Sequence, residues 1–267
     1  MTRDLARRVY RPVALIALLV VAVAILAASD ASAQDVFELE VFEYETAPPG
    51  GYEIAFHANG ISRASIGPAP KAANHRPVHM SAEITRGWTN RFETAVFVQT
   101  APFGSKGSAR FAGGHLRSKV RLGELSAVPL RLAVSAEYAF NRAVFDRELQ
   151  TLEIRPIFDY ARGRLSLVAN PSLEVVTRGS DGEGLEPVFD VSARGAWKIH
   201  ERVTLTTDYF SAAATTRHLQ PEPSAHHLIF AGLDLDLAAG WELGIGAGHC
   251  VTRGEPWLMK SVIGYRF

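Results

Sequence analysis

The chain has 267 residues, and its 28 Lys and Arg residues balance its 28 Asp and Glu residues, so the formal net charge at pH 7 is zero. This balance gives no electrostatic reason to expect a nucleic-acid or polyanionic partner. A single cysteine, Cys250, excludes an internal disulfide framework, and we interpret it as a small apolar residue near a strand end.

The N-terminus has the pattern of a secretory signal peptide. An uninterrupted apolar run over residues 13–28 follows four basic residues, Arg3, Arg7, Arg8 and Arg11. The small residues Ala31 and Ala33 come after this run. We expect cleavage after Ala33, so residues 1–33 are the predicted signal peptide and the mature chain, from Gln34, carries a net charge of about minus two. An uncleaved membrane anchor is the alternative interpretation.

Residues 34–51 do not fit a regular pattern. Apolar and polar residues alternate from Val36 until Phe42 breaks the step, and Pro48-Pro49-Gly50-Gly51 then predicts a turn. The rest of the chain, from Tyr52, predicts about twelve membrane-spanning strands. A spanning strand here would be the thirteenth, and it would place the two termini on opposite sides of the membrane. We therefore expect residues 34–51 to form a periplasmic N-terminal arm, or a short strand at the mouth of a barrel.

From Tyr52 onward the chain divides into segments of about ten residues in which apolar and polar side chains alternate. Such alternation over successive short segments is typical of transmembrane barrels. We expect about twelve strands, at residues 52–61, 78–85, 92–100, 115–122, 130–140, 152–160, 165–175, 186–197, 203–209, 229–237, 241–248 and 257–267. The predicted fold class is all-β, an antiparallel transmembrane β-barrel over residues 52–267. Pro156 and Pro171 predict a bulge or bend in their strands.

A soluble β-sandwich would also have one apolar face per strand, but the connections favour a barrel. Links after even-numbered segments are mostly short, at 86–91, 161–163, 198–201 and 238–240, whereas links after odd-numbered segments include long ones, at 62–77, 101–114 and 212–224. Aromatic residues also gather near segment ends, as in interfacial belts. Trp88, Tyr160, Trp197, Trp241 and Phe267 would lie at the periplasmic ends, and Tyr138, Phe140, Tyr209 and Trp257 at the outer ends.

The last segment carries the most specific pattern. Residues Ile263, Tyr265 and Phe267 alternate to the chain end on one face of an extended strand. This ending resembles the closing strand of bacterial outer-membrane β-barrels, in which it is the assembly signal. The resemblance implies location in a bacterial outer membrane, with the barrel assembly machinery and outer-membrane lipid as partners. We expect this strand to pair with the strand that begins at Tyr52.

The polar faces of the predicted strands would line the lumen. Their charges separate into a basic set on the fourth to sixth segments and an acidic set on later segments: Arg117, Lys119, Arg121, Arg131 and Arg155, and Asp190, Asp208, Asp234, Asp236 and Glu242. Opposed walls of this kind would produce a field across a water-filled passage. We predict a narrow porin-like channel for passive movement of small solutes. The alternative is a closed structural or partner-binding barrel that acts through its extracellular loops.

Enzymatic and metal-dependent functions receive little support. His57-Ala58-Asn59-Gly60 is similar to the His-x-Ser-Asn-Gly run of outer-membrane phospholipases but lacks the serine nucleophile, and Ser62 lies beyond the glycine. Adjacent His226 and His227 would point to opposite faces of a strand, so we expect them, with His218, to be solvated rather than to bind a metal. No cofactor motif is present. We therefore expect no catalytic residues, no cofactor and no metal site.

Overall fold

A computed structural model describes residues 39–61, 78–103, 108–125, 128–146, 148–179, 187–215, 227–251 and 257–267. The predicted signal peptide, residues 34–38 of the predicted arm and the long link at 62–77 lie outside these ranges. Within these ranges there is no helix with the length and apolar character needed to cross a membrane.

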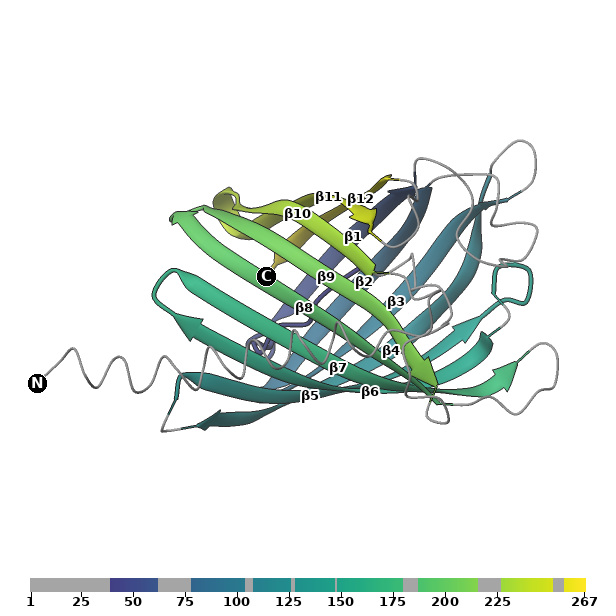
Figure 1. The fold of residues 1–267 in the computed structure, drawn as a ribbon, viewed down its shortest axis with the longest axis horizontal. Helices are drawn as coiled ribbons and strands as arrows, with labels where there is room; N and C mark the ends of the chain where they lie inside the picture. Colours follow the sequence, from purple (N-terminus) through teal and green to yellow (C-terminus); the bar gives the residue numbers. More distant parts are fainter. Residues whose placement is uncertain are drawn as a thin grey trace, which may run out of the picture.

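The described residues form a closed antiparallel barrel of twelve strands, which confirms the predicted fold class (Figure 1). Each strand pairs with its neighbours in the chain. The strands are β1 Tyr52–Ile61, β2 Val78–Thr89, β3 Phe92–Phe103, β4 Ser108–Leu125, β5 Leu130–Asn141, β6 Glu148–Arg162, β7 Leu165–Gly179, β8 Val188–His200, β9 Val203–Thr215, β10 His227–Asp236, β11 Trp241–Cys250 and β12 Trp257–Arg266.

The barrel closes between its first and last strands, as the terminal pattern predicts. β1 and β12 are antiparallel over Glu53↔Arg266 to Ile61↔Leu258. Beyond the last ladder pair, Tyr52 and Phe267 exchange two backbone hydrogen bonds with N···O distances of 2.9 and 3.0 Å, and their rings stack with centroids 5.7 Å apart. The ladder therefore has no free edge strand.

The connections differ in length between the two barrel ends. At one end, which we call the short-turn end, the strands are joined by residues 90–91, 126–129, 163–164, 201–202 and 237–240. The C-terminus lies at this end (Figure 1). The predicted long link at 101–114 is wrong, because β3 and β4 continue to pair through Phe103↔Ser108 after a register shift at Gln99/Thr100. Gly113 resembles a turn residue in the sequence, but it lies in β4, where a Cβ atom would collide with the backbone of β5.

Of the bulge or bend predicted at the two prolines, the bulge is absent, because β6 and β7 show no register shift there. Pro156 lies opposite Pro171, since β6 and β7 pair as Ile154↔Leu173 before them and as Phe158↔Ala169 after them, with no change of register. Proline lacks an N–H donor, so two prolines at facing positions interrupt the hydrogen bonds of the ladder without requiring an extra residue.

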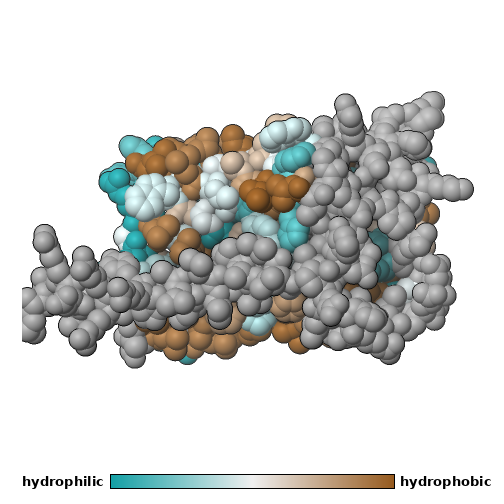
Figure 2. All heavy atoms as spheres, viewed as in Figure 1, coloured by the Kyte–Doolittle hydropathy of each residue, from teal (hydrophilic) through white to brown (hydrophobic). Residues whose placement is uncertain are grey.

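The two faces of the wall have opposite chemistry. Apolar side chains are exposed on the outer face, for example Phe56, Ile84, Val96, Leu116, Ile154, Leu205 and Met259, whereas polar side chains are buried inside, for example Glu83, Gln99, Asp159, Asn170 and Asp208. Figure 2 shows the hydrophobic residues spread over the outer wall. A continuous exposed apolar band is the surface that a barrel presents to lipid.

Exposed aromatic side chains lie near both ends of this band. Trp88, Trp197, Trp241 and Phe267 are exposed at the short-turn end, and Tyr138, Phe140 and Trp257 are exposed at the opposite end. Tyr160 and Tyr209 are half-buried. Amphipathic rings at these heights suit the two membrane–water interfaces.

The outer face provides a test of membrane depth. Ile154 lies near the middle of β6, and Ile154→Arg is expected to lower the free energy of unfolding by about 2–4 kcal/mol, the typical cost of arginine at the bilayer midplane. Ile199 is exposed near the end of β8, and Ile199→Arg is the matched control, with an expected cost of about 0–1 kcal/mol. Denaturant titration of the barrel in lipid vesicles measures both values, and equal costs would contradict this placement of the membrane.

Candidate functional site in the barrel interior

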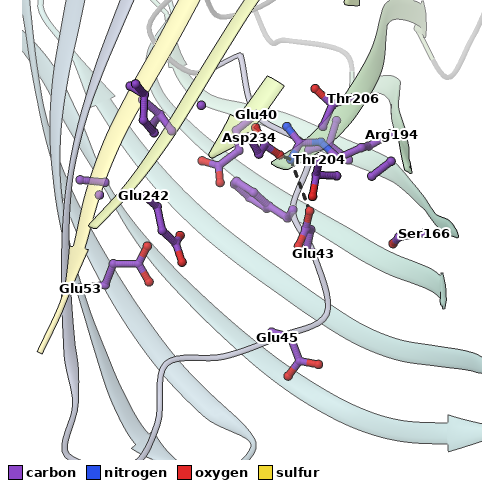
Figure 3. Close-up of a pocket in the computed structure, with 18 of the residues that line it drawn as sticks. Glu40, Glu43, Glu45, Glu53, Ser166, Arg194, Thr204, Thr206, Asp234 and Glu242 are labelled. Atoms are coloured by element: carbon purple, nitrogen blue, oxygen red, sulfur yellow. Dashed lines mark hydrogen bonds and ion pairs between the residues drawn. The ribbon is translucent and has the colours of Figure 1, made fainter. Parts of the chain in front are cut away.

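The predicted periplasmic arm differs most from expectation, because its described part runs inside the barrel. Residues 39–51 contain no strand, and the segment from Leu39 to Ala47, which we call the inner segment, passes between the walls (Figures 1 and 3). Its side chains Leu39, Val41, Phe42 and Tyr44 are buried in one apolar cluster with wall residues that include Ile157, Phe210 and Phe230. The apolar residues that break the strand pattern in the sequence therefore fill the barrel interior.

Side chains of the wall satisfy the backbone of the inner segment. The Asn170 amide of β7 accepts a hydrogen bond from Phe42 N at 2.7 Å and donates one to Phe42 O at 3.0 Å. Lys260 of β12 donates to Leu39 O at 3.1 Å, and Glu93 of β3 accepts from Ala47 N at 2.6 Å. Partners on such widely separated strands enclose the segment, and buried backbone groups require partners of this kind.

The predicted basic residues surround the two aromatic rings of the inner segment. Arg117 and Arg155 lie over Phe42, with the guanidinium carbon 4.4 and 4.2 Å from the ring centroid. Arg121 and Arg131 lie over Tyr44, at 4.3 and 4.9 Å. These distances are within the range of cation–π attraction, which is stronger where water is excluded.

The same basic residues form ion pairs with wall carboxylates. Arg117 binds Glu83 at 2.6 Å, Lys119 binds Glu93 at 2.9 Å, Arg131 binds Asp159 at 2.8 Å and Arg155 binds Glu153 at 2.8 Å. Arg121 and Arg131 also bind Glu45 of the inner segment, at 3.4 and 2.5 Å. The sequence places these carboxylates on polar strand faces, but charge counting alone did not identify them as partners of the basic wall.

Three of the five predicted acidic residues form ion pairs with basic residues of the wall. Arg194 of β8 binds Asp208 at 2.7 Å and Asp234 at 3.3 Å, and Lys260 makes a short contact with Asp208. Glu242 binds Arg266 at 2.9 Å. Asp190 is half-buried on β8, and Asp236 is exposed at the end of β10. The two charge sets are therefore less separated in space than in the sequence, because Arg194, Lys260 and Arg266 lie among the acidic residues.

A cavity of about 590 Å³ lies between the inner segment and the wall, and it extends to Arg164 and Lys198 at the short-turn end (Figure 3). Of the predicted lumen residues, Arg117, Lys119, Asp234, Asp236 and Glu242 line it. Glu43 projects from the inner segment and binds Arg194 at 3.3 Å.

The remaining predicted residues occupy defined positions. Ile263 and Phe267 of the predicted assembly signal are exposed, and the Tyr265 ring lies 4.9 Å from Trp241 and 5.9 Å from Phe267. Cys250 is buried at the end of β11. His227 lies 2.7 Å from the Tyr209 hydroxyl, whereas His218, His226 and Ser62 lie outside the described residues.

Comparison with known proteins gives likenesses of fold only. No protein-family model matches the chain, and no curated protein matches it either. Among solved structures, the KdgM porin in complex with disordered oligogalacturonate is 10% identical with a TM-score of 0.54, covering 80% of this chain and 99% of that one. An outer-membrane channel from Pseudomonas putida F1 is 10% identical with a TM-score of 0.57, covering 86% and 100%. The NanC porin is 9% identical with a TM-score of 0.53, covering 79% and 97%.

The chain has the fold of bacterial outer-membrane porins and channels. This fold and the exposed apolar band on the outer wall are those of a barrel that spans a lipid bilayer. The long inner segment and its polar partners then lie within the membrane-spanning part of the protein.

Asn170 offers a test of how the inner segment is held. Asn170→Ala removes both hydrogen bonds to Phe42 and leaves its buried N–H and C=O without these partners, so we expect unfolding free energy to fall by about 1–3 kcal/mol. Asn90→Ala, in the exposed turn between β2 and β3, is the control, with an expected change within about 0.5 kcal/mol. Denaturant titration in lipid vesicles compares the two, and equal small effects would show that Asn170 does not hold the segment.

Proposed function

We propose that the barrel is a narrow channel for passive movement of small solutes along the space beside the inner segment. The observation that carries this proposal is the water-accessible cavity, lined by charged side chains, inside a lipid-facing barrel. In a closed barrel we would expect the interior charges to be fully enclosed by their ion-pair partners. Here several charged side chains line the cavity and are accessible to water. An open row of charges can interact with a passing solute.

The exposure of these charges favours cations over anions. The side chains of Glu43, Glu45 and Asp234 are 50%, 59% and 41% exposed. The arginines that pair with them are less exposed: Arg194 is 14% exposed, Arg131 23% and Arg121 25%. Basic side chains are more exposed near the short-turn end, where Arg164, Lys198 and Arg266 lie. The interior therefore presents mainly carboxylates to water, which should concentrate cations.

The first test is electrical. In planar bilayers we expect small discrete conductance steps and a reversal potential that indicates cation preference in a salt gradient. The triple variant Glu43→Gln, Glu45→Gln and Asp234→Asn should lose most of that preference, since it removes the exposed negative charges. Glu201→Gln, in the exposed turn between β8 and β9, is the control and should retain the wild-type preference.

Two results would argue against this proposal. Anion preference in the wild-type protein would contradict the charge argument while leaving a channel in place. Absence of conductance from protein that is folded, as shown by heat-modifiable gel mobility, would instead favour a closed or partner-binding barrel.

The width of the passage should depend on the inner segment. Phe42→Ala removes a buried ring between Arg117 and Arg155, so we expect a larger single-channel conductance. Leu116→Ala removes an apolar side chain of similar kind from the outer face of β4 and should leave conductance unchanged. An unchanged conductance in Phe42→Ala would mean that ions do not pass beside this ring.

A further inference from the structure

We infer that Glu40, His57 and Glu83 form a binding site for a divalent transition metal of the Zn²⁺ type, which attaches the inner segment to the barrel wall. One potential ligand atom from each of the three residues lies within 4.8 Å of the other two. Glu40 belongs to the inner segment, His57 to β1 and Glu83 to β2. A metal held by all three would add a further attachment of the inner segment to the wall, beside its hydrogen bonds to Asn170, Lys260 and Glu93.

The wall half of the site follows from strand register. His57 is opposite Ser81, and Glu83 is opposite Ala55, so His57 and Glu83 are diagonal neighbours on adjacent strands. Both are buried on the inner face. Diagonal neighbours on one face of a sheet are within reach of long side chains. The pair is therefore brought together by the barrel itself and does not depend on the inner segment.

The spacing of this pair suits a tetrahedral metal. His57 Nε2 lies 3.3 Å from Glu83 Oε2. Two ligand atoms at about 2.0–2.1 Å from a tetrahedral Zn²⁺ are about 3.3 Å apart. An imidazole with two carboxylates is a donor set for Zn²⁺ and its first-row neighbours, whereas Ca²⁺ and Mg²⁺ favour oxygen ligands alone.

The other oxygen of Glu83 is held away from His57 by two donors. Glu83 Oε1 accepts hydrogen bonds from Arg117 Nη2 at 2.6 Å and Thr85 Oγ1 at 2.5 Å. These contacts orient the carboxylate so that Oε2 faces His57. Metal-binding carboxylates are commonly oriented by outer hydrogen bonds of this kind.

Glu40 provides an independent indication of a cation. Its Oε2 atom is buried and has no hydrogen-bond partner among the described residues. Nearby Lys260 donates its hydrogen bonds to Leu39 O and to Asp208, not to Glu40 Oε2. A buried carboxylate oxygen without a donor is unfavourable, and it lies here beside a second carboxylate. A metal ion among Glu40, His57 and Glu83 would relieve both costs.

The test is metal binding by the folded full-length mature barrel in detergent, after treatment with a chelator. We expect one Zn²⁺ per barrel by calorimetric titration, and Co²⁺ in its place should show the visible absorption of a four-coordinate site. Glu40→Gln and His57→Gln should each weaken Zn²⁺ binding by at least about tenfold, since even outer-sphere partners are worth about 10–100-fold. Glu40→Gln leaves every wall residue in place, so it remains informative if His57→Gln fails to fold.

Two matched variants control for non-specific binding. Glu45→Gln removes another carboxylate of the inner segment, one that binds Arg131 and Arg121, and Cys250→Ser removes the only thiol. Both should bind Zn²⁺ like the wild-type protein. Zn²⁺ should also raise the denaturant midpoint of the wild-type barrel but not that of Glu40→Gln, because binding to the native state alone stabilises it.

Failure is readily recognised. No stoichiometric Zn²⁺ binding by the wild-type protein, or equal loss in Glu40→Gln and Glu45→Gln, would overturn the inference and leave His57, Glu83 and Arg117 as a purely ionic cluster. Because these measurements do not involve conductance, their outcome is separate from that of the proposed channel function.

Discussion

Closure of the hydrogen-bonded ladder between β1 and β12 is the constraint on which the rest of the structure depends. In lipid, a strand edge with free N–H and C=O groups is prohibitively unfavourable, so the sheet must meet itself. The register from Glu53↔Arg266 to Ile61↔Leu258 achieves this, and it places both ends of the barrel sequence at the short-turn end. Strand alternation around a closed ring then requires one face to meet lipid and the other to face the lumen.

In the closed barrel many apolar side chains face outward, and polar and charged side chains are buried inside. Arg117, Lys119, Asp159 and Asp208 are buried inside, where an unpaired charge would be strongly unfavourable. Each has a counter-charge on the wall, and the pairs cross between neighbouring strands and to more distant ones. The inner segment adds aromatic rings over the guanidinium groups. The interior therefore consists of a network of ion pairs on the wall around an apolar cluster. Leu39, Val41, Phe42 and Tyr44 of the inner segment, which is not part of the sheet, contribute to that cluster.

In the proposed channel, permeation would depend on the inner segment. The segment narrows the lumen, and its Glu43 and Glu45 provide two of the exposed charges in the remaining space. Its contacts divide into a basic side at Phe42 and Tyr44 and a carboxylate and imidazole side at Glu40. The contacts of Phe42 and Tyr44 are cation–π contacts with arginines. The position of Glu40 depends on the cation inferred to bind between Glu40 and Glu83. Any movement of the segment would alter channel width and channel charge together.

Local patterns predicted much of the fold because side-chain alternation in a strand is a property of neighbouring residues. Twelve strands and the short turns at one end followed from periods of two and from turn residues. The pairing of the last strand with the first followed from the resemblance of the chain's ending to the closing strand of outer-membrane barrels. Predictions failed where a residue type that is common in turns or bulges lies within a regular strand. The predicted link at 101–114 includes Gly113, which instead lies in β4 and allows close approach of β5, and the two prolines lie opposite each other without a bulge.

The sequence by itself determined the class of protein, since an apolar stripe on every strand can be satisfied only by lipid or by a second sheet, and the connections favour lipid. Only the tertiary structure decided the course of residues 39–47 and the partner of each charge. The reason is that these contacts join residues far apart in the chain, such as Phe42 and Asn170 or Glu40 and Glu83, and no local period records them. Glu83, a polar residue in an alternating strand, has Arg117 and His57 as partners because the folded wall brings β1, β2 and β4 close together.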